Sequence, residues 1–162
     1  MKIVADSSPL ISCARAGKLA LIRSVYPRIL IPPAVYREIV MEGAGRPGAE
    51  EVKAAVSVWI EIKEPGCENL VSEVKQRLGD GESEAIALAK ELNGYILADE
   101  GSAIAEARKR GVRVKSTLLM LLEAKEQGFI SSVRVELGQL IDSGFRCSEA
   151  LYQKVLALSD EL

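Results

Sequence analysis

Two aspartates stand where a parallel sheet would bring them together. Asp6 directly follows the segment 2–5, which is apolar from Ile3 on, and Asp99 follows the apolar run 94–98 in the same way. A stretch with helical patterning comes after each aspartate, so both runs are predicted to be strands of an α/β sheet. Such sheets bind their ligands at the carboxyl ends of the strands. If the two strands are neighbours, the two carboxylates lie side by side.

Two adjacent carboxylates require a cation, because like charges at that distance repel and raise each other's pKa. The sequence contains no histidine and no closely spaced pair of cysteines, so only oxygen ligands are on offer. Oxygen ligands favour a hard divalent ion such as Mg²⁺ or Mn²⁺. We expect Glu38 and Glu84 to join Asp6 and Asp99 around it. Such an ion can orient a water molecule for attack on a phosphodiester.

The two glutamates are predicted to lie on helices. Glu38 falls in the middle of a helix that opens at Pro32-Pro33 and runs to about residue 42. Glu82 and Glu84 both fall in the first turn of a helix over 81–92. Residues two apart do not share a helix face, so we expect only one of them to face the metal, and periodicity does not decide which. Each acid taken alone could equally be a surface group or a residue favoured by the helix dipole.

The composition excludes several classes of enzyme. Without histidine the chain has no Ser-His-Asp or Cys-His catalytic group, no H-E-x-x-H helix and no His-bound zinc. There is no phosphate-binding G-x-x-x-x-G-K-[ST] loop and no G-x-G-x-x-G fingerprint. Haloacid-dehalogenase phosphatases need a second aspartate two residues after the first, where this chain has Ser8, and the acidic pattern of response-regulator receivers is also absent.

Cellular context follows from the cysteines and from hydropathy. Three isolated cysteines predict neither a disulfide framework nor a zinc ribbon. We expect neither a signal peptide nor a membrane span, and therefore a cytoplasmic protein of a reducing compartment.

The remaining pattern predicts one domain, 1–162, of alternating strands and helices. Further strands are expected at 28–31, 58–62 and 111–114. Helices are expected at 10–26 with a break at Gly17, from 49, at 69–78, at 102–110 and from a Ser116 cap to about 128. Residues 129–162 are predicted to form two terminal helices packed on this domain. The alternation indicates a parallel sheet covered on both faces.

With the four acids in order along the chain, the sequence resembles the PIN domain, the metal-dependent nuclease fold of VapC-type toxins, and in particular its branch described as predicted nucleic-acid-binding proteins. The resemblance covers nearly the whole chain. It is carried by four segments: residues 6–11 beginning with Asp6, PAVYREIV with Glu38, GESEAIALA with Glu84 and ILADEGSAIAEARKRGV with Asp99.

The resemblance implies a three-layer α/β/α sandwich around a central parallel sheet of four to five strands. It also implies an Mg²⁺ or Mn²⁺ site formed by the acids of the four segments, RNA as the usual substrate, and often a homodimer. The resemblance favours Glu84 over Glu82 as the third acid. Supporting roles are expected for Ser7 or Ser8 beside Asp6, and for Glu82 and Glu100.

Basic residues cluster after each aspartate, although the net charge is −2. Such clusters are usually solvated helix faces, but phosphate contacts need only positive charge. The residues expected to contact RNA are Arg15, Arg108, Lys109 and Lys115.

Two functions are predicted. The first is a metal-dependent endoribonuclease, as the toxin of a toxin–antitoxin pair with an antitoxin protein as its partner. The alternative is a non-catalytic PIN-like module that binds RNA or a protein. Retention of all four acids favours the enzyme, because clustered carboxylates only weaken binding to a polyanion.

Overall fold

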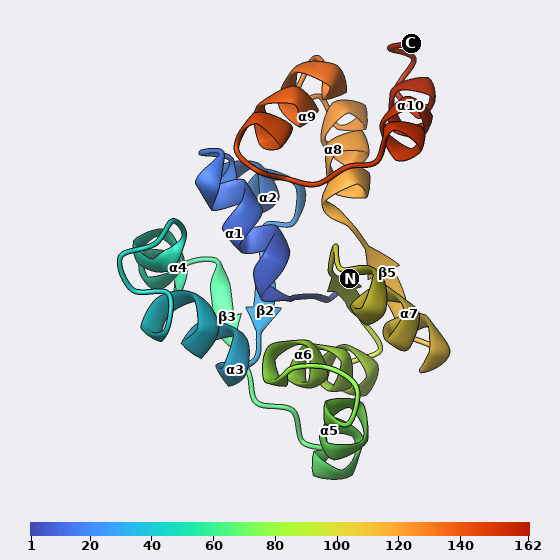
Figure 1. Cartoon of the computed structure of the whole chain (residues 1–162). Helices are drawn as coiled ribbons and strands as arrows, with labels where there is room; N and C mark the ends of the chain where they lie inside the picture. Colours follow the sequence, from blue (N-terminus) through green and yellow to red (C-terminus); the bar gives the residue numbers. More distant parts are fainter.

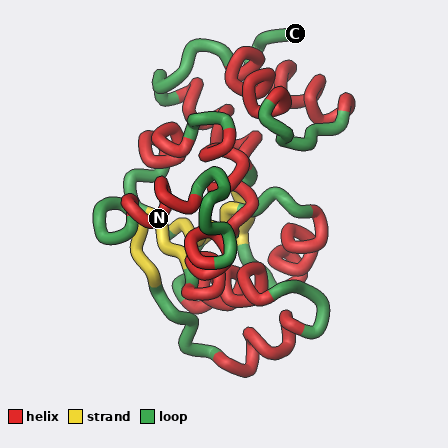
Figure 2. The backbone as a smooth tube through the Cα atoms, turned by 60° about the vertical axis from the view of Figure 1, so that its left-hand side comes forward, coloured by secondary structure: helices red, strands yellow, loops and turns green.

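The chain forms one five-stranded parallel sheet, seen in a computed structural model that describes residues 1–162. The strand order is β3-β2-β1-β4-β5, and every neighbouring pair is parallel. The strands are β1 (Ile3–Ala5), β2 (Ile29–Ile31), β3 (Ile60–Ile62), β4 (Tyr95–Leu97) and β5 (Arg113–Lys115). Helices cover both faces of this sheet, so the predicted three-layer α/β/α sandwich is confirmed (Figures 1 and 2).

The helices follow the strands in the expected alternation. They are α1 (Ser7–Arg15), α2 (Leu19–Val25), α3 (Pro33–Tyr36), the π-helix η1 (Arg37–Met41), α4 (Ala49–Ala55), α5 (Glu68–Lys75), α6 (Asp80–Glu91), α7 (Gly101–Lys109), α8 (Thr117–Glu126), α9 (Val133–Asp142) and α10 (Glu149–Leu158). Most boundaries differ from the predicted ones by a few residues. None of the helices combines the length and apolarity that crossing a membrane requires.

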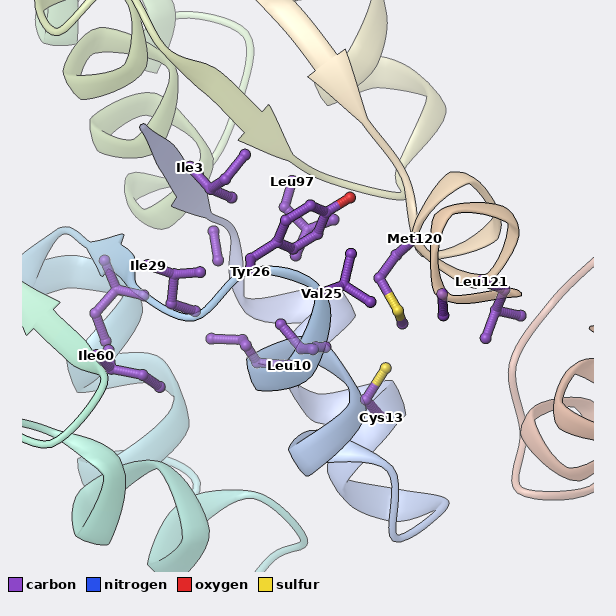
Figure 3. Packing of buried hydrophobic residues seen from close by; sticks show 14 of the residues in the cluster. Ile3, Leu10, Cys13, Val25, Tyr26, Ile29, Ile60, Leu97, Met120 and Leu121 are labelled. Atoms are coloured by element: carbon purple, nitrogen blue, oxygen red, sulfur yellow. The ribbon is translucent and has the colours of Figure 1, made fainter. Parts of the chain in front are cut away.

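Alternation along each strand divides the interior into two cores. Ile3 and Ala5 of β1 point into the larger core, while Val4 between them points into the smaller one. The larger core collects side chains from α1, α2, α8 and α9, and Figure 3 shows part of it around Leu10 and Tyr26. The smaller core packs α6 against the other face of β1 and β4. Two apolar faces explain why these strands read as continuous hydrophobic runs.

Serine caps fix the start of the last three helices. Ser116, Ser132 and Ser148 each accept the backbone N–H three residues later, which satisfies one free donor of α8, α9 and α10. The Ser116 cap was predicted from the sequence. The segment 129–132 was predicted to be helical, but it is a turn because the Ser132 cap sets the start of α9.

The C-terminal helices are packed onto one another and onto the start of the chain. α9 packs on both α1 and α8, and α10 packs on α8 (Figure 1). Glu161, after α10, accepts hydrogen bonds from Ser132 Oγ, Val133 N and Arg134 N at the start of α9. Burial would raise the pKa of this carboxyl, but these donors together with Lys125 lower it to about 2. This network ties the segment after α10 to the start of α9.

Candidate functional site

The sheet order brings Asp6 and Asp99 to the same place. β1 and β4 are neighbours, with Ala5 paired to Leu97, and the backbone N–H of Asp6 donates to the carbonyl of Leu97 at 3.0 Å. β2 and β3 lie on one side of β1, and β4 and β5 lie on its other side. The strand order therefore reverses between β1 and β4. Ligands of open α/β sheets bind at such switch points. The expectation that the two strands are neighbours is confirmed.

Asp6 is deeply buried, with 1% of its surface exposed. It caps the N-terminus of α1, where its Oδ1 accepts the backbone N–H of Ser7 at 2.8 Å. Burial raises the pKa of Asp6 to about 7 against the opposing effect of that hydrogen bond, and the charges of Glu82, Glu38 and Asp99 raise it further. These carboxylates are therefore close enough to repel one another.

Glu38 is held by the first turns of two other helices. Its Oε2 accepts the Ser7 hydroxyl at 2.8 Å, and its Oε1 accepts the backbone N–H of Gly81 at 3.0 Å. A Cβ at position 81 would lie 2.6 Å from both carboxylate oxygens, so this approach requires glycine. Glu38 lies within η1, and such π-helical turns occur frequently at functional sites.

Glu82 and Glu84 face different neighbours. Glu84 Oε1 accepts the backbone N–H of Ala34 at 3.1 Å, which satisfies a free donor in the first turn of α3. Burial raises the pKa of Glu82, against a hydrogen bond from Gly79, and the charges of Glu100 and Glu38 add to the rise. Glu82, and not Glu84, is also among the charges that raise the pKa of Asp6. The structure thus brings Glu82 to the acidic group and turns Glu84 toward α3, and which of the two faces a metal stays a prediction.

Asp99 is anchored by a residue that the sequence did not single out. Its two oxygens accept the backbone N–H of Thr117 at 2.8 Å and the Thr117 hydroxyl at 2.6 Å. Burial raises the pKa of Asp99, the two Thr117 hydrogen bonds oppose this, and the charge of Glu100 adds to the rise. Glu100 is exposed and stands at the N-cap position of α7, where its side chain makes no hydrogen bond to the helix. The only sequence signal for Thr117 was its place directly after the predicted Ser116 cap.

No lysine or arginine forms an ion pair with these acids. The group Asp6, Glu38, Glu82, Asp99 and Glu100, which we call the acidic centre, takes part in none of the nine ion pairs of the structure. In their present rotamers, however, no three acidic, cysteine or histidine side chains stand close enough to hold a metal ion. Both oxygens of Glu38 and of Asp99 are occupied by protein donors. The acidic centre thus fits a hard divalent ion in donor type and charge, but it would have to exchange some of these hydrogen bonds for the ion.

The basic residues predicted to contact RNA differ in exposure and in their protein partners. Lys115 is only 11% exposed in its side chain, pairs with Glu123 at 2.7 Å and lies over the rings of Tyr26 and Tyr95. These contacts engage the ammonium group of Lys115 within the protein, and its role toward RNA stays a prediction. Arg108 and Lys109 are exposed in the last turn of α7 and have no ion-pair partner. Arg108 also borders a cavity that includes Asp99.

A family model described as the PIN domain matches residues 2–161. The chain belongs to the PIN domain family. A solved structure of a PilT N-terminus domain protein from the hyperthermophilic archaeon Sulfolobus solfataricus P2 is similar to this PIN domain over 92% of this chain and 98% of that chain, at 19% identity and a TM-score of 0.49. No curated protein matches significantly. PIN domains are generally nuclease-like and use divalent metal ions.

Proposed function

We propose that this PIN domain is a metal-dependent endoribonuclease that hydrolyses RNA phosphodiester bonds with Mg²⁺ or Mn²⁺. The observation that supports this most is the acidic centre itself, which gathers five carboxylates at the switch point of the sheet without a single lysine or arginine partner. Carboxylates that raise each other's pKa destabilise the fold when they ionise, and a bound divalent cation would relieve their repulsion.

Within this proposal, Asp6, Glu38, Glu82 and Asp99 hold the ion. When bound, the ion supplies an oriented water nucleophile and neutralises charge that develops on phosphate. Ser7 and Thr117 position the side chains of Glu38 and Asp99 through their hydroxyl groups. Glu84 acts indirectly: it holds α3 against α6, and the position of Glu38 depends on that contact.

A cleavage assay tests the proposal. Single-stranded RNA labelled at its 5′ end should be cut in Mn²⁺ or Mg²⁺ and remain intact in EDTA. Asp6→Asn should slow cleavage by at least the roughly 100-fold that altering a metal's outer partners can cost. Asp142→Asn is the matched control, because Asp142 is exposed at the end of α9 and should cut like the parent. Equal cleavage by Asp6→Asn and the parent would remove the acidic centre from the reaction.

One observation favours the second candidate, a PIN-like module that binds RNA without cutting it. The internal hydrogen bonds of Glu38 and Asp99 already satisfy their oxygens without a metal. RNA binding that survives EDTA, together with no cleavage in any divalent ion, would select this module. A toxin role, an antitoxin partner and a homodimer stay predictions.

A further inference from the structure

A small polar cavity opens beside the acidic centre. Its volume is about 240 Å³, and it is bordered by Ser8 and Ser12 of α1 and by Asp99 and Glu100. The remaining wall is the connection between α9 and α10, through Gly144, Phe145 and Arg146. Arg146 therefore reaches the acidic centre from a segment that lies more than forty residues further along the chain than Asp99.

A second cavity also borders α1. It has a volume of about 160 Å³, and Glu38 of the acidic centre contributes to its wall. Arg15 of α1 and Arg46 of the loop before α4 line it together with Ile11, Ile39, Gly43 and Pro47. Each of the two cavities thus combines a carboxylate of the acidic centre with at least one arginine.

The exposed face of α1 connects the two cavities. Ser8, Ser12 and Arg15 are spaced four and three residues apart, so they follow one stripe of the helix. A guanidinium nitrogen of Arg15 lies 3.4 Å from where a Cβ of Gly144 would be, between the first cavity and the second. In Figure 1 the connection from α9 to α10 runs past α1 in agreement with this contact.

The three arginines that line the two cavities have free guanidinium groups, as Arg23, Arg28 and Arg108 do elsewhere in the protein. Arg15, Arg46 and Arg146 have no side-chain hydrogen bond and no ion pair. The other five arginines, Arg37, Arg77, Arg110, Arg113 and Arg134, all have acidic or carbonyl partners. A free guanidinium presents a planar fork of donors that fits a phosphate group.

We propose that single-stranded RNA crosses the acidic centre along α1, with backbone phosphates held by Arg146 on one side and by Arg15 and Arg46 on the other. This inference rests on the proposed function. Asp6 is 1% exposed and lines neither of the two cavities, so the RNA backbone has to bend toward the protein to bring a phosphate near it. A flexible single strand can do so, whereas a duplex keeps its phosphates on the outside of a stiff rod. Phe145, partly exposed in the first cavity, adds an aromatic surface on which a base can stack.

Binding measured in EDTA tests this path without relying on cleavage. The probe is a fluorescein-labelled single-stranded RNA of mixed sequence, followed by anisotropy at several salt concentrations, with a hairpin duplex for comparison. Arg146→Ala, Arg15→Ala and Arg46→Ala should each weaken binding by roughly two- to fivefold. Each should also lower the slope of log affinity against log salt by about 0.7. The control is Arg28→Ala. Arg28 is an unpaired arginine just before β2, so it lies at the amino-terminal ends of the strands, opposite the acidic centre.

Three outcomes are decisive. The path would be supported if the three variants bind RNA more weakly and with a flatter salt slope, while Arg28→Ala binds as the parent does. This support would hold even if no divalent ion produces cleavage. Unchanged affinity and salt slope in Arg146→Ala and Arg15→Ala would overturn the proposed RNA path. If the parent nevertheless cleaves RNA, the nuclease proposal would still stand. Equal or tighter binding of the duplex would overturn the single-stranded substrate.

Discussion

At the scale of the residue, the buried carboxyl of Asp6 opposes folding when it ionises. The side chain has one hydrogen-bond donor, Ser7 N, and three acidic neighbours, so burial dominates and its pKa rises to about 7. The folded protein therefore retains a proton that the unfolded chain has already released near pH 4. A position that costs stability in this way is typical of a functional site.

The metal-free protein should become less stable as pH rises from about 4 to about 7. A rise in pKa from 3.8 to about 7 corresponds to roughly 4 kcal/mol at about 1.36 kcal/mol for each pH unit. Asp6→Asn removes this ionisation, so its free energy of unfolding should change much less over the same range. Urea unfolding in EDTA between pH 4 and pH 8 measures both proteins. Parallel curves for the two proteins would show that Asp6 ionises normally in the fold.

At the scale of the element, two helices satisfy each other's free donors. Glu38 of η1 accepts the N–H of Gly81 in the first turn of α6, and Glu84 of α6 accepts the N–H of Ala34 in the first turn of α3. Each carboxylate thus lies at the positive end of the partner helix. This reciprocal contact fixes where Glu38 stands relative to β1, and it assigns Glu84 to holding the elements together.

Substituting Glu84 should lower the stability of the fold, whereas substituting Glu82 should weaken the response to Mn²⁺. Glu84→Ala leaves the Ala34 N–H without its partner and should lower the free energy of unfolding by about 1–2 kcal/mol, while the response to Mn²⁺ is kept. Glu82→Ala relieves repulsion with Asp6 and Glu38, so it should cost little stability and weaken the Mn²⁺ response. Melting curves with and without Mn²⁺ compare the two variants. The reverse pattern would restore Glu84 as the third acid.

At the scale of the whole molecule, local patterns were enough to predict the sheet and the meeting of Asp6 with Asp99. The apolar runs of β1 and β4 are each followed by an aspartate, and a parallel sheet brings the carboxyl ends of neighbouring strands to the same side. The choice between Glu82 and Glu84 was beyond such patterns. It depends on how α6 is rotated on the sheet, which the packing of Ala85, Ile86 and Ala89 against the smaller core decides.

The basic residues were harder to assign, because charge alone does not reveal partners. No partner for Lys115 was apparent in the sequence, whereas in the structure it pairs with Glu123 and lies over the rings of two tyrosines. Arg146 was not singled out, because it lies far from every acidic motif and only the α9–α10 connection carries it to α1. Thr117 was missed for the same reason, since its contact with Asp99 depends on β5 lying beside β4.

The measurement that tests the metal site most directly is a melting curve of the full chain at pH 7.5, with and without Mn²⁺. A ligand present at about 100 times its dissociation constant stabilises the folded state by roughly 2.7 kcal/mol, which corresponds to about 5–10 °C in a domain of this size. The parent and Asp142→Asn should show this shift, and Asp6→Asn should show almost none. No shift in the parent, or the same shift in Asp6→Asn, would contradict a metal site in the acidic centre.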